Sequence, residues 1–118
     1  MSVTRTIPLP IHGAIEAFAA PAIMAGPFVL GLGTVTTAVA LVIGAVLLWS
    51  AISVVGTERP MSLSAHASFD YALAYTAVIG GVVAGLSGEV LGMVFLVGVG
   101  AAHLLLTATT RFSIARGA

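Results

Sequence analysis

The fold is decided by one stretch, Thr34–Val55, which reads TVTTAVALVIGAVLLWSAISVV and contains no charged side chain. At about 1.5 Å per residue, a helix of this length spans about 33 Å, enough to cross a hydrocarbon core about 30 Å thick. Three other stretches have similar length and apolar character: about Pro10 to Gly31, Ala65 to Leu86 and Gly88 to Thr110. The sequence therefore predicts four membrane-spanning helices.

The composition of the whole chain supports the same conclusion. Of its 118 residues, 59% are hydrophobic and 7% are charged, and the mean hydropathy is +1.18. A soluble bundle of this size needs a polar stripe on every helix, because only one face of each helix can be buried. The chain has no such stripes, so we expect lipid or other membrane subunits to cover its apolar faces. We predict a single transmembrane domain over 1–118 and no soluble catalytic domain.

The spacing of the apolar stretches predicts two helical hairpins. Only Leu32-Gly33 separates the first two stretches and only Ser87 the last two, so both connections are tight turns. The connection 56–64 contains Pro, Gly, Ser and two charged residues, which is typical of an aqueous loop. We therefore predict an all-α, four-helix transmembrane bundle, with one hairpin repeat over about 10–55 and the other over about 65–110.

The arginines predict the orientation of the bundle. They all fall on one side of it: Arg5, Arg59, Arg111 and Arg116. By the positive-inside rule, both termini and the 56–64 loop are expected to be cytoplasmic. We expect the membrane to be a bacterial inner membrane. A cleavable signal peptide ending near Ala17-Phe18-Ala19 is the alternative, and Glu16 argues against it because it interrupts the apolar region.

The rare polar residues of the two halves coincide when the chain is shifted by 54 residues. His12 then falls on His66, and Glu16 falls on Asp70. Each His lies four residues before its carboxylate, so both side chains share one helical face. We expect these four residues, together with His103 and the Trp49 indole, to converge at the cytoplasmic end of the bundle. The coincidence predicts an internal repeat with a pseudo-two-fold axis along the membrane normal.

These polar residues leave several functions open. In the simplest, each His neutralises the carboxylate one turn away, and the protein is a non-catalytic accessory or self-associating subunit of a homo-oligomer or larger membrane complex. Alternatively, the protein is a small proton- or ion-coupled transporter or channel. Its proton- or ion-binding residues would then be His12, Glu16, His66, Asp70 and His103. A third alternative is a redox carrier. In it, His12, Glu16, His66 and Asp70 bind a divalent ion such as Zn, Mn or Fe, or the two His ligate haem b.

We assign structural roles to the remaining unusual positions. Pro21 and Pro27 predict a kink with free backbone acceptors in the first helix. Tyr71 and Tyr75 are expected to pack in the bundle core, and Glu89 is expected to be a charge at a helix N-terminus.

Small residues recur along the apolar stretches and predict close helix packing. Gly88 and Gly92 are four residues apart, and Gly98 and Gly100 follow in the same stretch. Such positions let helix backbones approach one another where lipid provides no hydrophobic driving force for association.

Several function classes lack support in the sequence. The chain has no Cys, which excludes disulfides and thiolate ligands. It has no Lys and no basic run, so nucleic-acid binding is not expected. The chain carries no nucleophile elbow, phosphate-binding Gly loop or zinc-protease motif, and we predict that it is not an enzyme.

One segment resembles a known family. The first hairpin has Gly26-Pro27-Phe28-Val29-Leu30-Gly31 at the end of its first helix and a central Gly44 in its second. This arrangement resembles the bacterial SPW-repeat membrane proteins, in which a Ser-Pro-Trp motif stands where this chain has Gly26-Pro27-Phe28. The second half has Gly80-Gly81-Val82 instead. The resemblance implies a small two-hairpin membrane protein without an assigned activity.

Overall fold

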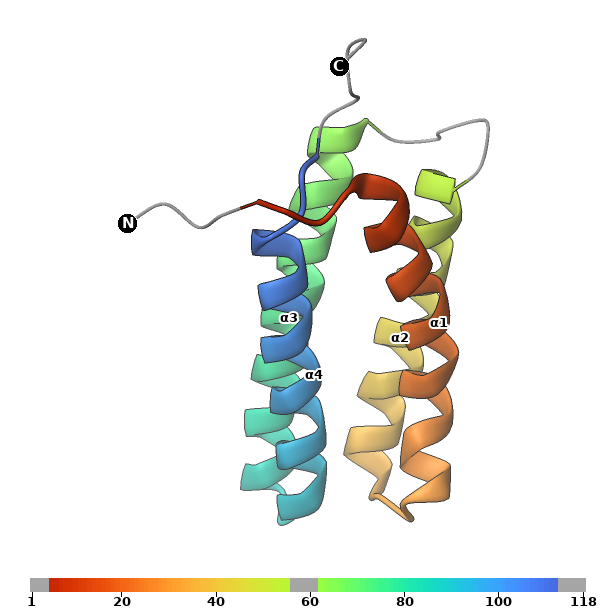
Figure 1. Cartoon of the computed structure of the whole chain (residues 1–118). Coiled ribbons are helices and arrows are strands. Elements are labelled where there is room, and N and C mark those ends of the chain that lie inside the picture. Colours follow the sequence, from red (N-terminus) through yellow and green to blue (C-terminus); the bar gives the residue numbers. More distant parts are fainter. Residues whose placement is uncertain (1–4, 56–61, 113–118) are drawn as a thin grey trace, which may run out of the picture.

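A computed structural model describes residues 5–55 and 62–112 of the chain. They form four helices (Figure 1): α1 (Leu9–Val29), α2 (Thr34–Val55), α3 (Leu63–Leu86) and α4 (Val90–Ala108). Each helix is long and apolar enough to cross a membrane. The predicted all-α, four-helix bundle is confirmed, and its four candidate spans indicate a multi-pass membrane protein.

The bundle consists of two hairpins. α1 packs along α2 and α3 packs along α4, while the contacts between the hairpins are mainly those of α2 with α3. The chain reverses at Gly31 and Gly88, whose φ angles of 65° and 91° are readily adopted only by glycine. Both turns lie at one end of the bundle, and the segments before α1 and after α4 meet at the other end (Figure 1).

The third helix begins earlier than expected. α3 starts at Leu63 because the Ser62 hydroxyl accepts a hydrogen bond of 3.1 Å from the Ala65 backbone N–H and so caps the helix. The rest of the predicted loop, with Glu58 and Arg59, lies outside the described residues, as does Arg116.

Apolar side chains fill the interior and also cover the outside. The buried core is formed by small and aliphatic side chains from all four helices: Ala20, Ile23, Ala40, Ile43, Leu47, Leu73, Ala77, Ala84 and Leu96. On the outer faces, Phe18 is 81% exposed and Leu86 is 85% exposed. Exposing such area to water costs about 25 cal/mol per Å² of apolar surface, a cost that surrounding lipid removes.

α1 continues through both of its prolines. Pro21 and Pro27 lie inside one uninterrupted helix, and Pro27 is buried. Neither residue ends the helix, although each lacks the N–H that would bond to the preceding turn. Membrane helices tolerate this loss because neighbouring elements hold the freed backbone groups.

Glycines bring the helices of the bundle into close contact. A Cβ on Gly100 would lie 2.7 Å from the Ala74 carbonyl oxygen, so α4 touches the backbone of α3 there. A Cβ on Gly92 would overlap the Thr36 side chain on α2. At Gly98, in contrast, a Cβ would meet no atom of the described residues within 4 Å, so this position faces open space. The predicted close packing inside the bundle is therefore confirmed at Gly92 and Gly100, whereas Gly98 makes no such contact within the described residues.

Glu89 joins the hairpins at the end where the turns lie. It is the residue before α4, but its side chain makes no capping bond to that helix. Instead its carboxylate accepts hydrogen bonds from the backbone N–H groups of Val35 (3.1 Å) and Thr36 (3.0 Å) and from the Thr36 hydroxyl (2.8 Å). The expectation of a charge at a helix N-terminus is correct, but the helix is α2 of the other hairpin. The bonds from Thr36 hold the pKa of Glu89 below its usual value.

Adding one methyl group at the α3–α4 contact should loosen the second hairpin. We expect Gly100→Ala to destabilise the protein by about 1–3 kcal/mol, because the new Cβ meets backbone that cannot move aside. Gly98→Ala is the matched control on the same helix and should not destabilise. Thermal unfolding in detergent, followed by circular dichroism, compares the two variants, and equal losses would contradict the assigned contact.

The Glu89 carboxylate should make stability depend on pH. Its folded-state pKa lies below the ordinary 4.5, so its stabilising effect is present above pH 4.5 and is lost as the pH falls through the lowered pKa. Glu89→Gln should therefore unfold at a lower temperature than the wild type at neutral pH, with the difference shrinking in acid. If the difference in unfolding temperature between wild type and Glu89→Gln stays constant down to the lowest pH at which the protein is folded, the charge of Glu89 does not contribute to stability.

Candidate functional site

Five polar side chains meet inside the bundle, near the end where the chain segments before α1 and after α4 lie. α1 supplies His12 and Glu16, α3 supplies His66 and Asp70, and α4 supplies His103. The first four side chains are at most 1% exposed, and His103 is 10% exposed. The convergence expected from the four-residue spacing is therefore present in the structure.

The four most buried residues form a ring of alternating nitrogen and oxygen atoms. His12 Nε2 lies 2.8 Å from Asp70 Oδ2 and 3.0 Å from Glu16 Oε1. His66 Nε2 lies 3.1 Å from each of the same two oxygens. All four atoms fit within 4.8 Å of one another. This compact set of two imidazoles and two carboxylates could hold a metal ion.

The pairing differs from the simple expectation of one His for each carboxylate on the same helix. Those pairs exist, but the hydrogen bonds with good geometry run between hairpins, from His12 to Asp70 and from His66 to Glu16. The cluster therefore connects α1 with α3, two helices whose backbones do not pack against each other within the described residues.

The outer nitrogens of the two rings are fixed by hydroxyl groups. His12 Nδ1 lies 2.7 Å from Thr110 Oγ1, and His66 Nδ1 lies 3.5 Å from Ser53 Oγ. Each hydroxyl donates its own hydrogen to a helix carbonyl at 2.6 Å, Thr110 to Leu106 and Ser53 to Ser50. The hydroxyl oxygens must then accept from Nδ1–H, which makes both Nδ1 atoms donors.

These outer contacts direct the chemistry to the inner nitrogens. With Nδ1 held by a hydroxyl, each ring turns Nε2 toward the two carboxylates, to which Nε2 hydrogen-bonds. Metal-binding His residues typically have this arrangement, in which the second ring N–H is held by an outer acceptor. Sequence reasoning missed Thr110 and Ser53, because their roles depend on contacts between distant parts of the chain.

The segments before α1 and after α4 cover one side of the site. The backbone of Ile7 pairs with the segment after α4, donating to the Thr109 carbonyl (3.0 Å) and accepting from the Arg111 N–H (2.9 Å). This pairing places the Phe112 ring against His12, with ring centroids 5.1 Å apart, and 6.1 Å from His66. Aromatic and backbone groups thus cover the cluster on this side.

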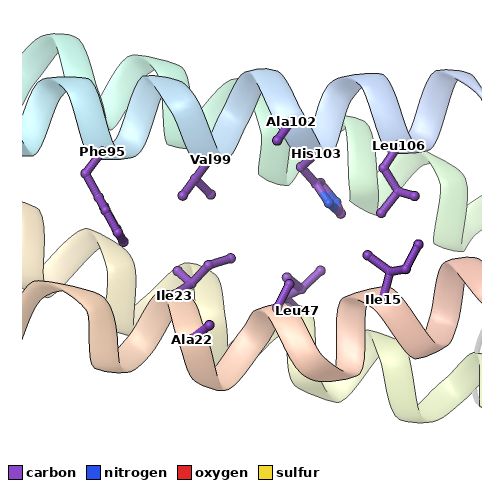
Figure 2. A pocket seen from close by; sticks show the side chains of 10 residues that line it. Ile15, Ala22, Ile23, Leu47, Phe95, Val99, Ala102, His103 and Leu106 are labelled. Atoms are coloured by element: carbon purple, nitrogen blue, oxygen red, sulfur yellow. The ribbon is translucent and has the colours of Figure 1, made fainter. Parts of the chain in front are cut away.

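His103 approaches the carboxylates from the other side. Its Nε2 lies 3.5 Å from Glu16 Oε2 and 3.4 Å from Asp70 Oδ1. These are the two carboxylate oxygens that do not contact His12 Nε2 or His66 Nε2 in the four-atom set. The same residue lines a cleft of about 340 Å³ between α1 and α4 (Figure 2). The other lining side chains are apolar: Ile15, Ala19, Ala22, Ile23, Leu47, Phe95, Val99, Ala102 and Leu106.

Two aromatic residues lie apart from the cluster, contrary to expectation. Trp49 is 50% exposed and packs edge-on against Phe69, because the inward face of α2 at this depth is taken by Ser50 and Ser53. Tyr75 is 56% exposed and does not pack in the core, whereas Tyr71 is half-buried.

The geometry favours a metal ion over the haem that the sequence left open. A porphyrin ligated by His12 and His66 would have to lie between their Nε2 atoms. Glu16 Oε1 and Asp70 Oδ2 already lie within 3.1 Å of both nitrogens and fill that space. Imidazole and carboxylate together suit Zn, Mn or Fe as single ions.

Comparisons with known proteins add no family to this description. No protein-family model, curated protein sequence or solved structure matches the chain. The resemblance to the SPW-repeat proteins therefore stays a prediction.

Removing the Thr110 hydroxyl should weaken the cluster without changing its shape. We expect Thr110→Val to destabilise the fold by about 1–3 kcal/mol, because it leaves the buried Nδ1–H of His12 without an acceptor. Thr109→Val is the control, since within the described residues that hydroxyl bonds only to carbonyls of its own helix. Unfolding in detergent measures both, and a Thr110→Val loss no larger than the control would contradict the hydrogen bond.

Proposed function

We propose that this chain is a small integral membrane protein that holds a divalent transition-metal ion at His12, Glu16, His66 and Asp70. The observation that carries the proposal is the compact set of two imidazole nitrogens and two carboxylate oxygens, in which each ring is also held from outside by a hydroxyl. Both Nδ1 atoms face hydroxyl oxygens that accept, so both Nε2 atoms are directed at the carboxylate oxygens. Metal-binding His residues are typically oriented in this way.

The four ligand atoms are close enough together to surround one ion. His12 Nε2 lies 2.8 and 3.0 Å from the two carboxylate oxygens, and His66 Nε2 lies 3.1 Å from both. An ion among them would meet two imidazole nitrogens and two carboxylate oxygens, which are ligand types that zinc binds.

Charge balance supports the same proposal. Glu16 and Asp70 are fully buried in a bundle whose outer surface is apolar. Carboxylates at such a depth are costly unless their charge is compensated, at roughly 2.5–3.5 kcal/mol each on insertion scales. One divalent ion with two neutral imidazoles brings the net charge of the site to zero.

The ion belongs to a non-catalytic component in this proposal, an accessory or self-associating subunit of a bacterial inner-membrane complex. Arg5 precedes α1 and Arg111 follows α4, and both are exposed at the end that carries the cluster. By the positive-inside rule, that end faces the cytoplasm. Retention of the ion is favoured over passage, because the paired end segments and Phe112 cover the site.

Metal analysis of the purified protein tests the proposal. We expect at least one transition-metal ion per chain in the wild type and its loss in the double variant His12→Ala plus His66→Ala. Glu89→Gln, which removes a carboxylate at the far end of the bundle, should retain the metal. Circular dichroism checks that each variant is helical.

A milder variant keeps the test decisive if the double variant does not fold. Thr110→Val should weaken metal affinity about 10- to 100-fold, because outer partners of ligating His residues contribute that much. Wild-type protein that neither contains nor takes up Zn²⁺, Mn²⁺ or Fe²⁺ would refute the proposal. So would unchanged metal content in the double variant.

A further inference from the structure

The side of the carboxylates that faces His103 has three buried polar atoms without partners. Glu16 Oε2, Asp70 Oδ1 and His103 Nε2 make no hydrogen bond within the described part of the chain. All three are shielded from the surroundings, and the two carboxylate side chains are 0% exposed. Buried polar atoms left unpaired cost about 1–3 kcal/mol each, so their meeting at one point requires an explanation.

A direct hydrogen bond does not provide that explanation. A bond between an imidazole N–H and a buried carboxylate is normally about 2.7–2.9 Å long. His103 Nε2 lies 3.5 and 3.4 Å from the two oxygens. These separations instead match two ligands of one ion, because the edge of a tetrahedron with bonds of about 2.1 Å is about 3.4 Å.

We infer that Glu16 Oε2, Asp70 Oδ1 and His103 Nε2 form a second metal site, bridged to the first by both carboxylates. The inference rests on the proposed function, since the first ion uses Oε1 and Oδ2 of the same two residues. His103 is not part of the compact four-atom set, and it approaches the carboxylates at their other two oxygens. Carboxylates that bridge two ions about 3.5–4 Å apart are typical of two-metal sites.

The second site differs from the first in its access. Three ligand atoms face it, and one of their residues, His103, lines the apolar cleft between α1 and α4 (Figure 2). A coordination position therefore stays open toward the cleft, whereas the first ion is covered by Phe112. Sites that keep an open position bind exogenous ligands, while closed ones are structural.

The charges define what the open position holds. Two divalent ions carry two more positive charges than Glu16 and Asp70 can neutralise. The remaining charge attracts an anionic oxygen ligand, hydroxide being the simplest, and the apolar cleft strengthens that attraction by excluding water.

Manganese titration of the metal-free protein in lipid nanodiscs tests this site. We expect the wild type to bind two Mn²⁺ per chain, with an exchange-coupled electron paramagnetic resonance signal from ions that share carboxylate bridges. His103→Ala should bind one Mn²⁺ and give an uncoupled signal. Added imidazole should restore the second ion, which a merely structural role of His103 would not permit.

A control variant and the alternative outcomes separate this inference from the proposed function. Val99→Ala changes the cleft wall without removing a ligand and should still bind two coupled ions. A single ion in the wild type, or two coupled ions in His103→Ala, would overturn the second site and leave the first intact. Wild-type protein that binds no ion would overturn both.

Discussion

The structure depends on the cost of placing a carboxylate inside a membrane. Glu16 and Asp70 are fully buried, and each lies against His residues from both hairpins. Because a lone charge is so unfavourable there, the two hairpins are held together wherever their polar groups can meet. The hydrogen bonds from one hairpin to the other, rather than apolar contact alone, set how α1 faces α3.

The same principle operates at both ends of the bundle with different partners. At the turn end, the Glu89 carboxylate meets the backbone N–H groups that begin α2, where the helix dipole favours negative charge. At the other end, carboxylates meet imidazoles. Between these two groups of polar contacts, close packing of glycines determines how near the helices approach each other. Examples are Gly92 against Thr36 and Gly100 against Ala74. The remaining gap between α1 and α4 is the apolar cleft that reaches His103.

Much of the fold could be predicted, because long apolar stretches separated by tight turns allow few arrangements. The four-residue spacing of each His and carboxylate also identified the cluster correctly. The hydroxyls of Thr110 and Ser53, and the ring of Phe112, could not be found this way, since each reaches the site only through tertiary contacts. For the same reason the outward direction of Trp49 and the partner of Glu89 were not predictable: neither follows from depth or local spacing.

The pairing of Ile7 with the segment after α4 has a consequence for biosynthesis. Ribosomes deliver α1 to the membrane first, when Glu16 has only His12 beside it. Asp70 and His66 follow with α3, and Thr110 arrives last of all. The site is therefore complete only after the segment that follows α4 has been synthesised, so a chain that stops before α3 would reach the bilayer with Glu16 partnered by His12 alone, a defect that membrane quality-control proteases could recognise.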